Sequence, residues 1–338
     1  MVACEPWGSN GAFDAGGRER ALAWPAGARP RFPLDTGARR RSCHRMQTRQ
    51  DMDARGTSAL IAIFVILAVN QVAIKLTNQG LQPVFAAGVR SLGAVFVLWV
   101  WMRLRGQRPD FAREALGAGL LVGMIFALEF LALFLALDLT TVSRASVIFY
   151  SMPVWMALTA HFVLPGERLT LPRLIGLGLA FAGVAWAILD RSGLSGEASL
   201  VGDLAALVAA FAWMGVSLAA RLTAISRQTP EMQIFWQVAV SAPVLLLLAP
   251  LFGPLVRDFS PQTAGLMVFQ IVVVASGVFL SWFWLLSRYK ASQVAGFAFL
   301  SPIFGVGVGW LWLGEAVTVS LLVKLALVAA GIVLINRR

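Results

Sequence analysis

Ten apolar stretches of about 20 residues follow one another from residue 58 almost to the end of the chain. Each is long enough to cross a hydrocarbon core of about 30 Å as an α-helix. The connections are short, so neighbouring helices run antiparallel and no soluble domain fits between them. The sequence therefore predicts an all-α integral membrane protein with ten transmembrane helices. The expected helices are residues 58–76, 83–102, 115–137, 143–164, 171–189, 200–221, 231–252, 263–286, 291–313 and 318–335.

Composition excludes other classes of protein. Of the 338 residues, 58% are hydrophobic and only 13% are charged, whereas soluble proteins carry about 25% charged residues. So few charges could not cover a globular surface, which excludes a soluble enzyme, a disordered protein and a nucleic-acid-binding module. Both cysteines, Cys4 and Cys43, precede the first apolar stretch. The hydrophobic part therefore has no thiolate metal site, and no metal or cofactor is expected.

Residues 1–55 are interpreted as a disordered tail. They are rich in Gly, Ala, Pro and Arg and show no helical or strand period. Pro25 interrupts the one apolar run that could form a signal-peptide core. Met46 and Met52 precede the first span, so the tail could be upstream sequence added by a mis-assigned start. A transit peptide is the alternative, against which the six acidic residues of the tail argue.

Basic residues predict the orientation in the membrane. Twelve Lys and Arg residues lie in the connections and terminus on the N-terminal side of the membrane, against four on the other side. Cytoplasmic loops carry the basic excess, so both termini are expected in the cytoplasm, with the protein in the inner (cell) membrane. The four residues on the opposite side are Lys75, Arg144, Arg191 and Arg257.

The two halves of the hydrophobic part, residues 58–189 and 200–336, match each other. The matching pairs, first half before second, are Pro83 with Pro230, Arg90 with Gln237, Ser143 with Ser292, Pro153 with Pro302, and Glu167 with Glu315. Several matches in register indicate a duplication. Because each half has five helices, the copies enter the membrane from opposite sides. Inverted repeats are typical of secondary transporters, with the substrate site between the halves.

The sequence also resembles the EamA-type transporters of the drug/metabolite transporter superfamily over residues 58–336. The matching pieces are Val72–Lys75, Arg90, the stretch from Ala136 to Pro153, PGERLT at 165–170, Gly202 to Trp213, Ser301-Pro302 and WLGEAVT at 312–318. The resemblance implies ten helices, an inverted five-plus-five repeat, a central cavity and movement of small metabolites, often outward. Asn70 and Gln71 stand where many members carry a Trp-Gly pair, and both are candidates for substrate contact.

Two charges inside predicted spans are the strongest functional candidates. A charge near the bilayer centre costs about 2.5–3.5 kcal/mol, so it is paired or functional. Arg90 and Glu129 are expected at similar depths, roughly 10 and 12 Å from the outer ends of their helices. They could form an ion pair or share a polar network. Glu129 could instead couple transport to a proton gradient, and both interpretations stay open. Lys324 is left unassigned.

Other residues carry two interpretations each. Pro153 and Pro302 are expected in mid-helix, where a kink could open carbonyls towards a cavity or the proline could simply be tolerated. Glu167 and Glu315 could gate the pathway or cap the following helices. Trp213 and Trp282 are candidates for the cavity lining or the interfacial belt.

One further polar residue and two pairs of glycines also carry predictions. Gln237, which matches Arg90, is a further substrate candidate. The glycine pairs Gly119/Gly123 and Gly305/Gly309 predict helix packing or the seam of a homodimer.

The sequence thus predicts a secondary transporter that exports small metabolites or amphipathic compounds by alternating access. The expected partners are a small-molecule substrate, the lipid bilayer and a proton gradient. No Walker A motif is present, which argues against ATP drive within this chain. A lipid-linked carrier flippase is the first alternative. A membrane-embedded enzyme is the weaker one, because no paired acids or histidine cluster lie in the spans.

Overall fold

The computed structural model describes residues 53–107, 109–163, 169–190, 199–289 and 297–336. The expected tail lies outside these residues up to residue 52. The described residues are helical, apart from connections and an isolated bridge between Leu81 and Val256. The α-helices are α1 (Ala54–Gly80), α2 (Pro83–Leu104), α3 (Arg113–Leu139), α4 (Val142–Phe149), α5 (Met152–Val163), α6 (Leu171–Leu189), α7 (Leu200–Leu222), α8 (Pro230–Leu248), α9 (Pro261–Val268), α10 (Phe279–Arg288), α12 (Leu300–Leu313) and α13 (Val319–Asn336). The other segments are the 3-10 turns η2 (Ala224–Arg227), η3 (Ala249–Phe252) and η5 (Phe297–Phe299) and the π-helical η4 (Phe269–Val278).

Within the described part of the chain, nine helical stretches are long and apolar enough to cross a membrane. The tenth expected span, 291–313, corresponds to a shorter apolar stretch, Phe297–Leu313, and the residues just before it lie outside the described part. Large apolar side chains such as Phe96, Phe162 and Leu247 are more than half exposed. Such exposure suits lipid rather than water. The protein is therefore a multi-pass helical membrane protein.

The helices begin at residues that satisfy the orphan N–H groups of a first turn. The Asp53 carboxylate accepts the Gly56 N–H at 2.7 Å at the start of α1, and Ser199 does the same for Gly202 at the start of α7. Pro83 and Pro230 are the first residues of α2 and α8. Proline suits that position, because its missing N–H would have no intrahelical partner there.

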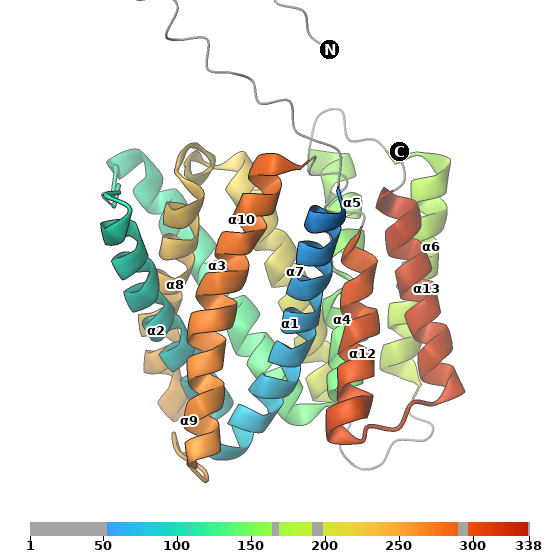
Figure 1. Cartoon of the computed structure of the whole chain (residues 1–338). Helices are drawn as coiled ribbons and strands as arrows, with labels where there is room; N and C mark the ends of the chain where they lie inside the picture. The colour runs from blue at the N-terminus through green and yellow to red at the C-terminus, as the bar shows by residue number, and fades with distance from the viewer. Residues whose placement is uncertain (1–52, 108, 164–168, 191–198, 290–296, 337–338) are drawn as a thin grey trace, which may run out of the picture. The chain divides into compact units, whose positions relative to one another are not determined.

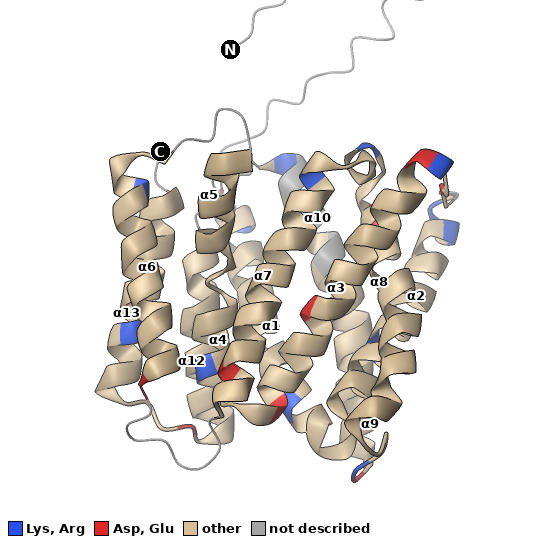
Figure 2. Ribbon diagram, turned by 180° about the vertical axis from the view of Figure 1, so that it is seen from behind, with Lys and Arg blue, Asp and Glu red and all other residues tan. Residues whose placement is uncertain are grey.

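All the long helices run between two ends of one bundle (Figure 1). We call the end at which α1 begins and α13 finishes the near end, and the opposite one the far end. Acidic and basic residues gather towards the two ends, with few between them (Figure 2). This distribution places the apolar middle of the bundle at the depth of the hydrocarbon core.

Glycines allow several helices to touch. A Cβ at Gly119 or Gly123 of α3 would lie 2.4 Å from the side chain of Trp236 or Val240 of α8. Gly176 of α6 likewise lies against the backbone of α13. The small residues predicted as packing sites therefore lie inside the bundle. The homodimer seam stays a prediction.

Candidate functional site

Arg90 of α2 and Glu129 of α3 are both buried, with 3% and 5% of their surface exposed. The Arg90 guanidinium lies 4.3 Å from the ring centre of Phe130, the residue next to Glu129. The direct ion pair considered from the sequence is not formed, since no salt bridge joins the two in the described residues. Arg90 Nε and one Glu129 oxygen have no hydrogen-bond partner. The two charges are nevertheless close enough to interact electrostatically.

Asn70 and Gln71 of α1 are buried, and both have polar atoms without a partner, Asn70 Oδ1 and Gln71 Nε2. The other amide atom of Gln71 accepts a short hydrogen bond from the Ser146 hydroxyl of α4. Tyr150 lies one turn further along the chain and is also buried. The structure thus joins α1 to α4 through polar side chains inside the bundle.

Trp213 of α7 lies beside this polar group. Its ring stacks on Phe149, with centroids 5.0 Å apart, and meets Tyr150 edge-on at 6.2 Å. The stacking brings an aromatic surface from the second half of the chain to residues of the first. Trp213 is therefore inside the bundle, as the cavity interpretation requires, and its contact with substrate stays a prediction.

Among the described residues, no hydrogen bond or ring contact joins Trp282 or Gln237 to this group. Trp282 of α10 packs edge-on against Phe64 of α1, in a small apolar cluster to which η4 and α12 also contribute. Gln237 is buried in α8, and in the described part of the chain no hydrogen bond or ring contact joins it to Arg90 or Glu129.

Both prolines lie at the start of a helical segment rather than in the middle of one. The expected helix 143–164 is interrupted at Tyr150 and Ser151, and Pro153 is the second residue of α5. Pro302 is the third residue of α12, directly after the 3-10 turn η5. Each proline still lies within a longer apolar stretch, Val142–Val163 or Phe297–Leu313, beside an interruption of its α-helix. Such an interruption suits proline, which cannot donate an N–H. Whether the freed carbonyls face a substrate stays a prediction.

Glu315 does not cap the helix that follows it. Its carboxylate accepts the backbone N–H groups of Val142 and Ser143 at 2.6 and 2.8 Å, and the Ser143 hydroxyl at 2.5 Å. It therefore caps α4, which belongs to the other half of the chain. The start of α13 is capped by Thr318, whose hydroxyl accepts the Leu321 N–H at 3.1 Å. Glu167 lies outside the described residues.

The sequence interpretation missed a buried ion pair at the far end. Arg144 Nη2 lies 2.7 Å from Asp203 Oδ2, and Arg144 Nε donates to Oδ1 at 3.2 Å. The Thr140 hydroxyl donates to the same carboxylate at 2.9 Å. The sequence alone counts Arg144 among the basic residues of the connections and assigns Asp203 no role. The available signal was that each lies in the first turn of an apolar helix, where a lone charge needs a partner.

Two more ion pairs lie at the far end. Lys324 of α13 contacts Asp190 at 2.7 Å, which assigns a partner to a residue that the sequence left open. Arg257 holds Asp138 through two hydrogen bonds of 2.7 and 3.0 Å. These contacts join α3 and α6 of the first half to α13 and the loop before α9 in the second.

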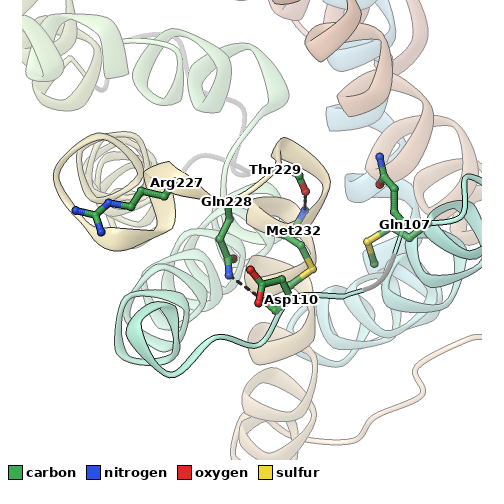
Figure 3. Close-up of a pocket in the computed structure, with 7 residues that line it drawn as sticks. Gln107, Asp110, Arg227, Gln228, Thr229 and Met232 are labelled. Atoms are coloured by element: carbon green, nitrogen blue, oxygen red, sulfur yellow. Dashed lines mark hydrogen bonds between the residues drawn. The ribbon is translucent and has the colours of Figure 1, made fainter. Parts of the chain in front are cut away.

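A pocket of about 280 Å³ opens at the near end, between the loop after α2 and the start of α8 (Figure 3). The Gln228 side chain crosses it and donates to the Asp110 carbonyl at 2.9 Å. None of the residues predicted as sites lines it. The lining residues are Met102, Gln107, Asp110, Arg227, Gln228, Thr229 and Met232.

Comparison with known proteins decides the family. The model of the EamA-like transporter family matches residues 54–189 and again residues 200–337. The chain belongs to this family. It is a membrane transporter rather than an enzyme, and its membership implies a small-molecule substrate.

Relatives of the chain carry transporter names. The uncharacterized transporter YoaV of Bacillus subtilis is 22% identical over 276 residues, covering 81% of this chain and 94% of YoaV. A probable amino-acid metabolite efflux pump of Salmonella typhimurium is 26% identical, covering 82% of this chain and 93% of the pump. A probable terminal-alkyne amino-acid exporter of Streptantibioticus cattleyicolor is 29% identical over 57% of this chain and 64% of its own.

A solved structure shares the fold of this EamA-family chain. A protein known from a crystal structure superposes with a TM-score of 0.59 and 20% identity, covering 83% of this chain and 97% of its own. At that identity the likeness shows the fold alone.

Proposed function

We propose that this transporter exports small amphipathic metabolites, amino acids among them, by alternating access between two inverted five-helix repeats. The observation that carries the proposal is the pair of buried opposite charges, Arg90 and Glu129, which do not contact each other. Buried charges left apart need other partners. A zwitterion would supply a carboxylate for Arg90 and an ammonium group for Glu129. Several relatives are named amino-acid efflux pumps or exporters.

The inverted repeat, residues 58–189 and 200–336, is supported by how the halves pack. The most extensive contacts of one half on the other have counterparts. The contact of α3 with α7 has its counterpart in the contact of α1 with the stretch from α9 to α10. The contact of α1 with α12 has its counterpart in the contact of α7 with α4 and α5. α4 with α12 and α6 with α13 are pairs of equivalent helices. A two-fold axis in the membrane plane relates such contacts.

We further propose that the near end faces the cytoplasm and that the membrane is the inner one. The basic residues of the connections favour this orientation, because cytoplasmic loops retain lysine and arginine. Export then moves the substrate from the near end to the far end. A proton moving inward through Glu129 would drive the substrate outward.

The charge assignment can be tested with modified substrates. In proteoliposomes with an imposed pH gradient, amino-acid methyl esters lack the carboxylate and N-acetyl derivatives lack the ammonium group. Both should compete at least tenfold less well than the parent compounds. Arg90→Gln should remove the discrimination against esters, and Glu129→Gln the discrimination against N-acetyl derivatives.

A matched control lies on the same helix. Glu114 of α3 is 84% exposed at the near end, so Glu114→Gln should change neither selectivity nor gradient-driven accumulation. Glu129→Gln should abolish accumulation if Glu129 carries the proton, while the protein still reaches the membrane. Equal competition by parent, ester and N-acetyl compounds in the unmodified protein would refute the zwitterion site. Normal accumulation in Glu129→Gln would refute proton coupling.

A further inference from the structure

The first turn of α4 is held by a side chain from the opposite half of the chain. The Glu315 carboxylate, just beyond α12, takes up two backbone N–H groups and one hydroxyl, at 2.5–2.8 Å. Those N–H groups would otherwise be orphans of a helix start. A negative charge there also meets the positive end of the helix dipole. The contact is therefore a charge-assisted clasp between α12 and α4.

The local backbone is built to permit this clasp. Gly314 ends α12 with φ +64°, a left-handed conformation that favours glycine, and this turns Glu315 back towards α4. Gly309 lies directly beneath the carboxylate, where a Cβ would stand 2.7 Å from Glu315 Oε2 and 2.9 Å from Ser143 Oγ. Only a residue without a side chain leaves room for the clasp at that point.

The clasp lies at the end of the bundle where ion pairs join the helices. Arg144–Asp203 and Lys324–Asp190 are buried or nearly so at the far end. At the near end, Arg227 and Glu114 form an ion pair that is 4.0 Å long and more than four-fifths exposed. Exposed pairs of this kind contribute little. Buried ion pairs therefore join helices at the far end, the same end as the clasp.

We propose that the Glu315–α4 clasp is the latch of the far mouth of the transport pathway. It is closed in this structure, and Glu315 leaves the first turn of α4 when the far mouth opens. The inference rests on alternating access between the halves, as proposed above. It adds the residues that hold one mouth shut. The Glu315 carboxylate accepts hydrogen bonds from Val142 and Ser143, and Gly309 leaves room for that carboxylate.

The latch can be tested by accessibility alone. Ser146 is fully buried one turn inside the clasp. Ser146→Cys, with Cys4 and Cys43 changed to Ser, gives a single reporter thiol. A membrane-impermeant maleimide is added to intact cells and, separately, to inverted membrane vesicles. With the latch closed, the thiol should react faster from the near end, which the vesicles expose.

Two variants open the latch in different ways. Glu315→Gln keeps the shape and removes the charge, whereas Gly309→Ala keeps the charge and displaces the carboxylate. Charge-assisted bonds are strong enough that each should raise labelling in intact cells about tenfold or more. Gly307→Ala on the same helix is the control, because a Cβ there meets nothing within 4 Å. It should leave labelling unchanged.

The proposal fails if both latch variants purify as monodisperse protein and label like the parent. It also fails if Gly307→Ala raises labelling as much as they do. Because no substrate is used, these outcomes are independent of whether the protein exports amino acids. A functional transporter with unchanged labelling would remove the latch and leave the proposed function intact.

Discussion

Breaking the Arg144–Asp203 pair should destabilise the protein severely. Asp203 is 0% exposed and Arg144 5% exposed. Asp203→Asn would leave the guanidinium without its anion in a low-dielectric site. Removing one partner of a buried pair costs about 3–5 kcal/mol. Since about 1.36 kcal/mol is a factor of ten, the folding equilibrium should fall by roughly two to four orders of magnitude.

The assay is thermal unfolding of the purified protein in detergent, followed by size-exclusion fluorescence. Asp138→Asn is the matched control, because Asp138 pairs with an Arg257 that is 40% exposed. That change should cost about 1 kcal/mol or less. The double variant Arg144→Met/Asp203→Leu should lose less stability than the sum of the two single variants, because it leaves no buried charge without a partner. Equal losses for Asp203→Asn and Asp138→Asn would refute the argument that burial sets the cost.

Three further predictions follow from single contacts. Gly123→Ala should destabilise α3–α8 packing by about 1–3 kcal/mol in the same unfolding assay, whereas Gly117→Ala, with nothing within 4 Å, should be neutral or stabilising. The pKa of Asp53 is lowered by hydrogen bonds from the Tyr289 hydroxyl and the Gly56 N–H. The cap therefore stabilises α1 fully above the ordinary pKa of Asp, and this stabilisation is lost as the pH falls through the pKa of Asp53 in the folded protein. Hydrogen exchange at the start of α1 should accelerate in acid. In Tyr289→Phe the same acceleration should begin at a higher pH. Arg90→Gln and Glu129→Gln should destabilise less in combination than the sum of the single losses, because the two charges interact; additive losses would contradict this.

The spans could be predicted from the sequence because their determinants are local. Length and hydropathy define a crossing helix, and residues such as Pro83 and Pro230 mark where two of them begin. The burial of Arg90 and Glu129 also follows from their place in apolar stretches. Whether the two side chains contact each other does not follow from the sequence. The Arg90 guanidinium lies over the ring of Phe130 instead, and that position depends on how α2 and α3 pack.

Contacts between distant segments of the chain could not be predicted from the sequence. Glu315 has an adjacent helix that it could cap, and the local rule favoured that helix. The structure places a different first turn, that of α4, within its reach, while Thr318 takes the local role. Arg144 and Asp203 are 59 residues apart in the chain. Only the packing of α4 on α7 brings them together.

The two halves share a pattern of packing but differ in charge at their centres. Arg90 has Gln237 as its counterpart, and the expected span 263–286, which corresponds to the helix of Glu129, contains no acidic residue. Both poles of the proposed zwitterion site therefore belong to the first half. If the halves rock against each other, the substrate moves with α2 and α3, and the second half opens and closes over it. Trp213 of the second half stacks on Phe149 of the first half, so this contact then changes between states. The contact of Arg90 with Phe130 lies within the first half and persists.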